Sequence, residues 1–202
     1  MEYLQDTPVA SLIFLITVAT SIYAFNNPSI YGKLMLHPYS VANGKKSYSL
    51  ITSGLIHADW MHLIFNMMTF YFFAFRLESM IGHWQFGVLY LASLVLADLP
   101  SVMKHKEHFW YNSLGASGAI SAVLFSYILF DPFTKLMLFP LPIPIPALLF
   151  AVLYLVYCAY ASKKSNDNIN HDAHFFGALS GVVITLILVP GILGHFIRLI
   201  SG

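Results

Sequence analysis

The chain has 202 residues, of which 58% are hydrophobic and only 9% are charged. Soluble domains carry about 25% charged residues, so this composition excludes an ordinary soluble globular protein. The formal net charge of +1 gives no indication of a nucleic-acid-binding surface. The single cysteine, Cys158, excludes an intrachain disulfide.

Long apolar stretches separated by short polar segments predict a chain that is mostly embedded in a membrane. A helix needs about 20 apolar residues to cross a hydrocarbon core of about 30 Å, and it satisfies its own backbone hydrogen bonds in lipid. We therefore expect an all-α membrane protein, a six-transmembrane-helix bundle, in a single domain over residues 1–202. The expected spans are residues 8–25, 50–75, 84–103, 114–130, 147–161 and 173–189.

The first two spans differ in their polar content. The acidic N-terminus lacks the basic region of a cleavable signal peptide, so we expect the first span to be retained. A short turn over residues 76–82 is expected before the third span, where Asp98 is assigned a structural role. Four polar side chains interrupt the second span: His57, Asp59, His62 and Asn66.

The fourth span opens with Gly115-Ala116-Ser117-Gly118, and a serine between glycines is unusual for packing alone.

The apolar tail over residues 192–200 is expected to lie along the membrane interface. Before the fifth span, prolines at alternate positions exclude a regular helix and predict an extended segment. These prolines are Pro140, Pro142, Pro144 and Pro146.

The number of spans predicts that the polar residues meet. Consecutive spans run in opposite directions, so the second, fourth and sixth spans begin on the same side of the membrane. His62 and Asn66 lie in the first half of the second span, Ser117 begins the fourth, and His174 begins the sixth. Three distant segments are therefore expected to place these side chains at a similar depth.

Small residues predict close contact between the fourth and sixth spans. Gly177 and Gly181 share a helix face with His174, and the fourth span offers Gly115 and Gly118. Small residues allow two membrane helices to approach closely. Such an approach would bring His174 within reach of the serine.

The residue types indicate acyl-transfer chemistry. Serine is a weak nucleophile until a base takes its proton, and histidine is the usual base near neutral pH. Ser117 and His174 form the expected pair. The oxyanion of the intermediate needs preorganised donors, for which the candidates are the Ser117 backbone N–H and the side chains of His62 and Asn66. Asp172 points away from His174 along a helix, so we expect a dyad.

These motifs resemble those of the rhomboid intramembrane serine proteases in their minimal six-helix bacterial form. Gly115-Ala116-Ser117-Gly118 is similar to the nucleophile motif of that family. The segment around His174, with Gly177 and Gly181, is similar to its general-base motif. His57-x4-His62-x3-Asn66 resembles its second-helix motif, in which the later histidine and the asparagine hold the oxyanion. His57 is assigned a supporting role.

The resemblance implies an intramembrane serine endopeptidase that cleaves transmembrane segments of other membrane proteins. It implies transmembrane protein substrates, a surrounding lipid bilayer, and no metal or cofactor. The implied location is a bacterial inner membrane, with the active site toward the outside.

One residue departs from the family pattern, and the distribution of lysines conflicts with the implied topology. Many members carry a tyrosine four residues after the nucleophile, which stacks on the histidine, and Ser121 occupies that position here. The implied topology also opposes the positive-inside rule, because seven lysines would lie outside. They are Lys33, Lys45, Lys46, Lys104, Lys106, Lys163 and Lys164, against Arg76, Lys135 and Arg198 inside.

Three alternatives stay open on the sequence. One is a catalytically inactive rhomboid-like protein that binds membrane helices. Another is a metal-dependent membrane enzyme, because His57-x4-His62 and His171-x2-His174 resemble histidine boxes. The third is a transporter or channel that uses the polar face as a pathway.

Overall fold

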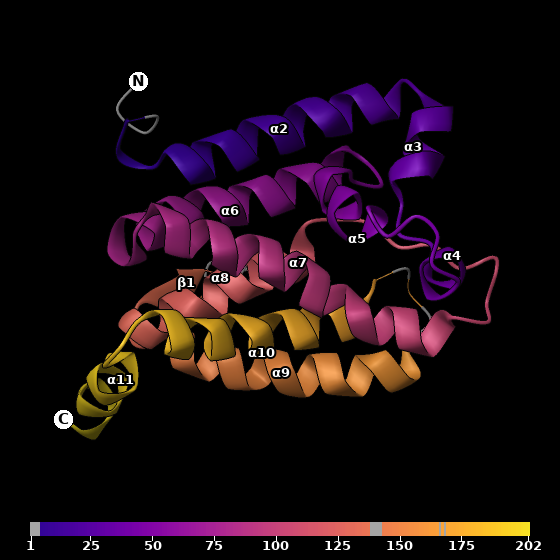
Figure 1. Ribbon diagram of the computed structural model, residues 1–202. Helices are drawn as coiled ribbons and strands as arrows, with labels where there is room; N and C mark the ends of the chain where they lie inside the picture. The colour runs from indigo at the N-terminus through magenta and orange to yellow at the C-terminus, as the bar shows by residue number, and fades with distance from the viewer. Residues whose placement is uncertain (1–4, 138–142, 166, 168) are drawn as a thin grey trace.

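The computed structural model describes residues 5–137, 143–165, 167 and 169–202, and it is a bundle of long helices (Figure 1). The long helices are α2 (Pro8–Phe25), α6 (Trp60–Ile81), α7 (His83–His105), α8 (Ser117–Phe130), α9 (Ala147–Lys164) and α10 (His171–Leu188). The shorter elements are α3 (Pro28–Leu34), α4 (Pro38–Ala42), α5 (Ser49–Thr52), the 3₁₀ helix η1 (Ser53–Leu55) and α11 (Ile192–Ser201).

Within the described residues, four helices are long and apolar enough to cross a membrane, namely α2, α7, α9 and α10. Helix α8 is apolar but has only 14 residues, and α6 has 22 residues that include several polar side chains. These lengths and compositions fit an integral membrane protein. The count of six spans stays a prediction.

Helix α8 is the buried centre of the bundle. Every residue from Gly118 to Leu129 is buried, and α6, α7, α9 and α10 all contact this helix. Its 14 residues extend for about 21 Å at 1.5 Å per residue, which is shorter than a hydrocarbon core of about 30 Å. If α8 lies across the membrane, at least one of its ends therefore lies within the hydrocarbon core.

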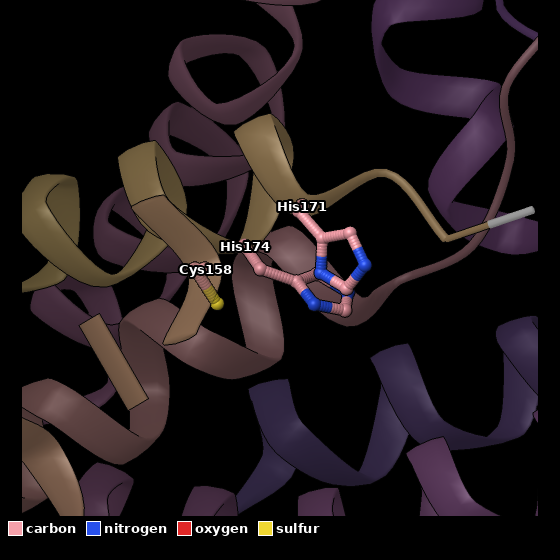
Figure 2. Close-up of side chains that lie close together, drawn as sticks. All are labelled: Cys158, His171 and His174. Atoms are coloured by element: carbon pink, nitrogen blue, oxygen red, sulfur yellow. The ribbon is translucent and has the colours of Figure 1, made fainter. Parts of the chain in front are cut away.

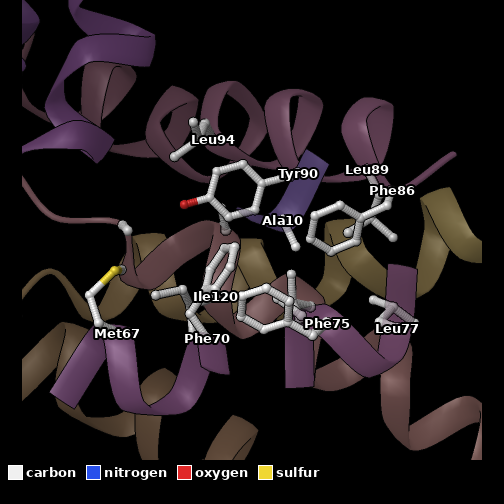
Figure 3. Packing of buried hydrophobic residues seen from close by; sticks show 14 of the residues in the cluster. Ala10, Met67, Phe70, Phe75, Leu77, Phe86, Leu89, Tyr90, Leu94 and Ile120 are labelled. Carbon is white, nitrogen blue, oxygen red and sulfur yellow. The ribbon is translucent and has the colours of Figure 1, made fainter. Parts of the chain in front are cut away.

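An aromatic cluster packs α6 against α7 (Figure 3). The Phe70 ring meets Tyr90 edge-on, with centroids 5.7 Å apart, and Phe75 at 6.0 Å. Phe86 and Ile120 complete the buried layer that joins these helices to α8. Edge-to-face contacts of this kind add stability beyond the burial of apolar area.

Glu78, near the end of α6, caps the beginning of α2. Its carboxylate accepts hydrogen bonds from the backbone N–H groups of Val9 (3.1 Å) and Ala10 (2.6 Å). The first N–H groups of a helix have no partner within the helix, so a buried carboxylate both satisfies them and complements the helix dipole. This contact fixes α2 against α6 at the end of the bundle opposite to Ser117.

The expected span over residues 50–75 was wrong at both ends. Residues 49–55 form α5 and η1, and α6 begins only at Trp60, because the Asp59 side chain accepts a hydrogen bond from the His62 N–H at 2.8 Å. The helix then continues to Ile81, through most of the expected turn over residues 76–82. Gly82, with φ of +95°, ends it.

A short antiparallel pair of strands precedes α9 and departs from the all-α expectation. Strand β1 (Lys135–Met137) pairs with β2 (Pro144–Pro146), with Leu136 opposite Ile145. The predicted extended conformation is therefore confirmed at Pro144 and Pro146, and α9 begins at Ala147 as expected. Pro140 and Pro142 lie outside the described residues.

Candidate active site

Helices α8 and α10 pack with their backbones in direct contact. A Cβ atom on Gly177 would lie 2.9 Å from the Gly118 Cα atom, and one on Gly181 would lie 2.5 Å from the Ala122 Cα atom. A Cβ on Gly118 would meet the Ala97 Cβ at 2.7 Å. Any side chain at these glycines would push the helices apart, as the sequence pattern predicts.

This close packing brings Ser117 and His174 together. The Ser117 Oγ and His174 Nε2 atoms lie 2.7 Å apart, within hydrogen-bonding distance. Ser117 is the first residue of α8, and His174 lies in the first turn of α10. Helices α8 and α10, which are distant in the sequence, therefore begin side by side.

Gly115 turns the chain into α8 and makes room for His62. Its φ of +116° lies in the region that only glycine adopts readily. A Cβ atom here would lie 2.6 Å from the His62 Cε1 atom and 2.8 Å from Nε2. The His62 ring therefore lies directly against the backbone that leads to Ser117.

The hydrogen bonds of His62 determine which ring nitrogen carries its proton. The Ala58 backbone N–H donates to Nδ1 at 3.3 Å, so Nδ1 is the acceptor. A neutral imidazole has one N–H, which must then be on Nε2, the nitrogen next to Gly115. His62 therefore presents a donor toward the start of α8.

The other two predicted residues of the second-helix motif lie nearby with different partners. Asn66 is buried, and its side-chain amide donates to the His62 carbonyl oxygen at 2.9 Å, within its own helix. His57 is fully buried, and its Nδ1 lies 3.0 Å from the Ser21 hydroxyl, which donates to the Leu55 carbonyl oxygen. His57 thus joins α2 to the loop before α6, a supporting position.

The ring that stacks on His174 comes from α9. Tyr154 lies with its ring 20° from parallel to His174, at a centroid distance of 6.2 Å. Its hydroxyl lies 2.7 Å from the Ser121 Oγ, at the position where the family pattern has a tyrosine. The sequence reasoning missed Tyr154, because the only signal was the serine at position 121.

A small cavity opens beside Ser117 and is lined by polar as well as apolar residues. Asp98 contributes to its wall and accepts a hydrogen bond from the Ser53 hydroxyl at 3.2 Å. Asn170 also lines it, donates to the Ser113 hydroxyl at 3.0 Å, and caps α10 by accepting from the Ala173 N–H. Asp98 therefore has a partner that the sequence did not reveal.

Charged residues lie at the end of the bundle where α10 begins, on α7, on α10 and in the loop between α9 and α10. Lys104 forms an ion pair with Asp172 at 2.6 Å, so at least this lysine lies at the same end of the bundle as Ser117. Hydrogen bonds from the Ser165 side chain, from His171 and from the Ile169 N–H lower the pKa of Asp167 to about 2. Asp167 is therefore a carboxylate at neutral pH.

One group of side chains could hold a metal ion among the residues that the structure describes. Cys158, His171 and His174 each offer a donor atom, and these atoms lie within 4.8 Å of one another (Figure 2). His57 and His62 are not part of this group, although their rings meet edge-on at 4.9 Å.

The chain is a bundle of apolar helices in which polar side chains meet at the start of a short buried helix. These features are typical of integral membrane proteins with an internal polar site. The family model for the rhomboid domain matches residues 44–191 of this chain. The chain therefore belongs to the rhomboid family, whose members are generally intramembrane serine proteases, with some inactive members.

Relatives come from bacteria and from eukaryotes. The chain is 33% identical to the putative rhomboid protease YdcA of Bacillus subtilis, over 74% of this chain and 70% of that protein. It is 31% identical to the mitochondrial Rhomboid protein 1 of Saccharomyces cerevisiae, over 67% of this chain and 40% of that protein. The mitochondrial RHOMBOID-like protein 12 of Arabidopsis thaliana is 27% identical, over 76% and 50%.

Proposed function

We propose that this chain is an intramembrane serine endopeptidase that cleaves transmembrane segments of other membrane proteins. Ser117 is the nucleophile and His174 is the base. The observation that carries the proposal is the 2.7 Å contact between the Ser117 Oγ and the His174 Nε2. It joins the first turns of two helices whose backbones touch at Gly118 and Gly177.

The reaction follows the general chemistry of a serine and histidine pair. The Nε2 atom of His174 takes the proton of the Ser117 hydroxyl while Oγ attacks the carbonyl carbon of the substrate peptide. The protonated His174 then donates to the leaving amine, and the C–N bond breaks. Water, deprotonated by the same nitrogen, hydrolyses the acyl-enzyme and regenerates Ser117.

Two donors next to Ser117 suit the negative charge that develops on the substrate oxygen. The Ser117 backbone N–H belongs to the first turn of α8, where N–H groups have no acceptor within the helix. The Nε2 atom of His62, which carries the ring proton, lies beside Gly115. The Asn66 amide donates one hydrogen bond to the His62 backbone carbonyl oxygen, and its second N–H is a further donor candidate.

Tyr154 holds the His174 ring in place of the family tyrosine. The proposal is supported by the near-parallel stack of the two rings and by the hydrogen bond between the Tyr154 hydroxyl and the Ser121 Oγ. No carboxylate orients His174 in this scheme, so the dyad depends on packing. Tyr154 is a positioning residue, because it acts on substrate only through His174.

The membrane arrangement that we propose has six spans. They are formed by α2, α6, α7, α8, α9 and α10. Ser117 then lies below the membrane surface, and the cleaved bond lies within or close to the bilayer. A stable helix hides its carbonyl groups in hydrogen bonds, so segments with small or helix-breaking residues are the preferred substrates. The proposed location is a bacterial inner membrane with the site toward the outside.

The experiment compares the wild type with Ser117→Ala and His174→Ala in liposomes that contain a generic transmembrane substrate. We expect cleavage by the wild type and none by either variant. Cleavage by Ser117→Ala would overturn the proposal. If the folded wild type binds the substrate but does not cleave it, the chain is an inactive family member.

A further inference from the structure

Cys158, His171 and His174 form a cluster that the proposed reaction uses only in part. Cys158 lies on α9 and is fully buried, whereas both histidines lie one helical turn apart on α10. Figure 2 shows the three side chains lying together between the two helices. Their ligand atoms all lie within 4.8 Å of one another. Small movements of the side chains would bring all three atoms to bonding distance of one ion.

The hydrogen bonds of His171 leave one ring nitrogen free to bind an ion. Its Nε2 lies 3.1 Å from both carboxylate oxygens of Asp167, and a carboxylate accepts, so Nε2 carries the proton. The lone pair is then on Nδ1, which is buried and has no hydrogen-bond partner within the described part of the chain. A buried nitrogen without a partner is costly unless something binds it.

Asp167 also stands where metal sites commonly have a supporting group. Histidines that bind metals usually donate their other N–H to a carboxylate, which fixes the ring and strengthens the ligand. His171 has this arrangement before any ion is bound. His174 has its Nε2 against Ser117, which leaves its Nδ1 for the ion.

We propose that Cys158, His171 and His174 bind a soft divalent cation, Zn²⁺ by ligand chemistry, and that this ion inhibits the enzyme. A thiolate with two imidazoles favours Zn²⁺ over hard cations such as Mg²⁺ or Ca²⁺. Binding forms an S–Zn bond and releases the Cys158 thiol proton to solvent. Three protein ligands leave a fourth position for water.

The inhibition follows from the tautomer of His174. An ion on Nδ1 uses the lone pair of that nitrogen, so the ring proton must be on Nε2. That nitrogen can then no longer accept the proton of Ser117. The inhibitory effect rests on the proposed protease activity, whereas the metal binding does not. A metal-dependent enzyme would behave oppositely and lose activity on chelation.

Metal binding is tested first, without reference to catalysis. The purified full chain in detergent is treated with a chelator and titrated with Co²⁺, which gives a thiolate-to-metal charge-transfer band when a cysteine binds it. We expect this band in the wild type and in Ser117→Ala, its loss in Cys158→Ala, and its displacement by Zn²⁺. Asp167→Asn should weaken binding by roughly 10- to 100-fold.

His105→Gln is the control, because His105 lies beside His108 in a separate histidine pair. It should leave the band unchanged. A folded wild type without the band, or a band that persists in Cys158→Ala, would overturn the site.

Cleavage is then compared with and without Zn²⁺ within each variant. Zn²⁺ should suppress cleavage by the wild type and not by Cys158→Ala. Suppression of both to the same degree would overturn the inhibitory role.

Discussion

The contact of Tyr154 with His174 is revealed neither by the family pattern nor by the spacing of residues in this sequence. Tyr154→Ala removes the ring that faces His174, and we expect kcat to fall by roughly 10- to 100-fold, because a small misplacement of a catalytic group has effects of that size. Tyr154→Phe keeps the ring and loses only the hydroxyl, with its contacts to Ser121 and Cys158, so it should retain most of the activity. Cleavage kinetics in liposomes measure both.

A rescue experiment separates positioning from a general structural defect. Ser121 touches the Tyr154 hydroxyl, so Ser121→Tyr in the Tyr154→Ala background returns an aromatic ring to the same space from α8. Recovery of kcat in this double variant is the expected result. If Tyr154→Ala were as active as the wild type, Tyr154 would have no role in holding His174.

His62 gives a second prediction at the level of one side chain. His62→Ala removes the Nε2–H that points to Gly115, and kcat should fall by about 10²- to 10³-fold, as for the loss of one oxyanion donor. KM should change little, because the interaction forms in the transition state. His195→Gln is the matched control, since His195 lies on α11 and bonds to the Phe130 carbonyl oxygen. Equal losses in both variants would contradict the role of His62.

Among the elements, the contact of α8 with α10 depends on glycine. Gly177→Ala places a methyl group against the Gly118 backbone, so the helices must separate, and we expect destabilisation of about 1–3 kcal/mol from overpacking. Cleavage at a temperature where the variant stays folded should fall as well, because Ser117 and His174 move apart. Gly32→Ala is the control, since no atom lies within 4 Å of a Cβ built there. An unaffected Gly177→Ala would refute the tight contact.

The position of α2 depends on Glu78. Glu78→Gln replaces the buried carboxylate, leaving one oxygen to accept from the N–H groups of Val9 and Ala10, and should destabilise the fold by about 1–3 kcal/mol. Thermal unfolding in detergent measures the change. The control is His83→Ala, which removes only the half-exposed partner of Glu78 and should cost at most about 1 kcal/mol. A larger loss from His83→Ala would contradict this account of the cap.

Several features of the helices could be predicted from the sequence, and others could not. The alternation of direction along the chain predicts that Ser117, His174 and His62 lie at one end of the bundle, and the glycine pattern predicts the close contact of α8 with α10. The start of α6 was not predicted, because the capping bond of Asp59 decides it locally. Tyr154 lies on a helix with no polar pattern that points to His174, so only the packed structure reveals it.

For the whole molecule, the orientation in the membrane is the open prediction. With the site outside, Lys45→Cys in a Cys158→Ala background should react with a membrane-impermeant maleimide in intact cells, because residue 45 is exposed in the loop between α4 and α5. Arg198→Cys, exposed on α11 at the other end, should react only after the cells are opened. The reverse pattern would show that the lysines follow the positive-inside rule instead.

The central claim is that Ser117 is a nucleophile activated by His174. The most direct measurement treats the folded chain with a fluorophosphonate and locates the adduct by mass spectrometry of its peptides. The account predicts one adduct, on Ser117, that disappears in His174→Ala while Ser117 is still present. An adduct on another serine, or undiminished labelling of Ser117 in His174→Ala, would contradict it.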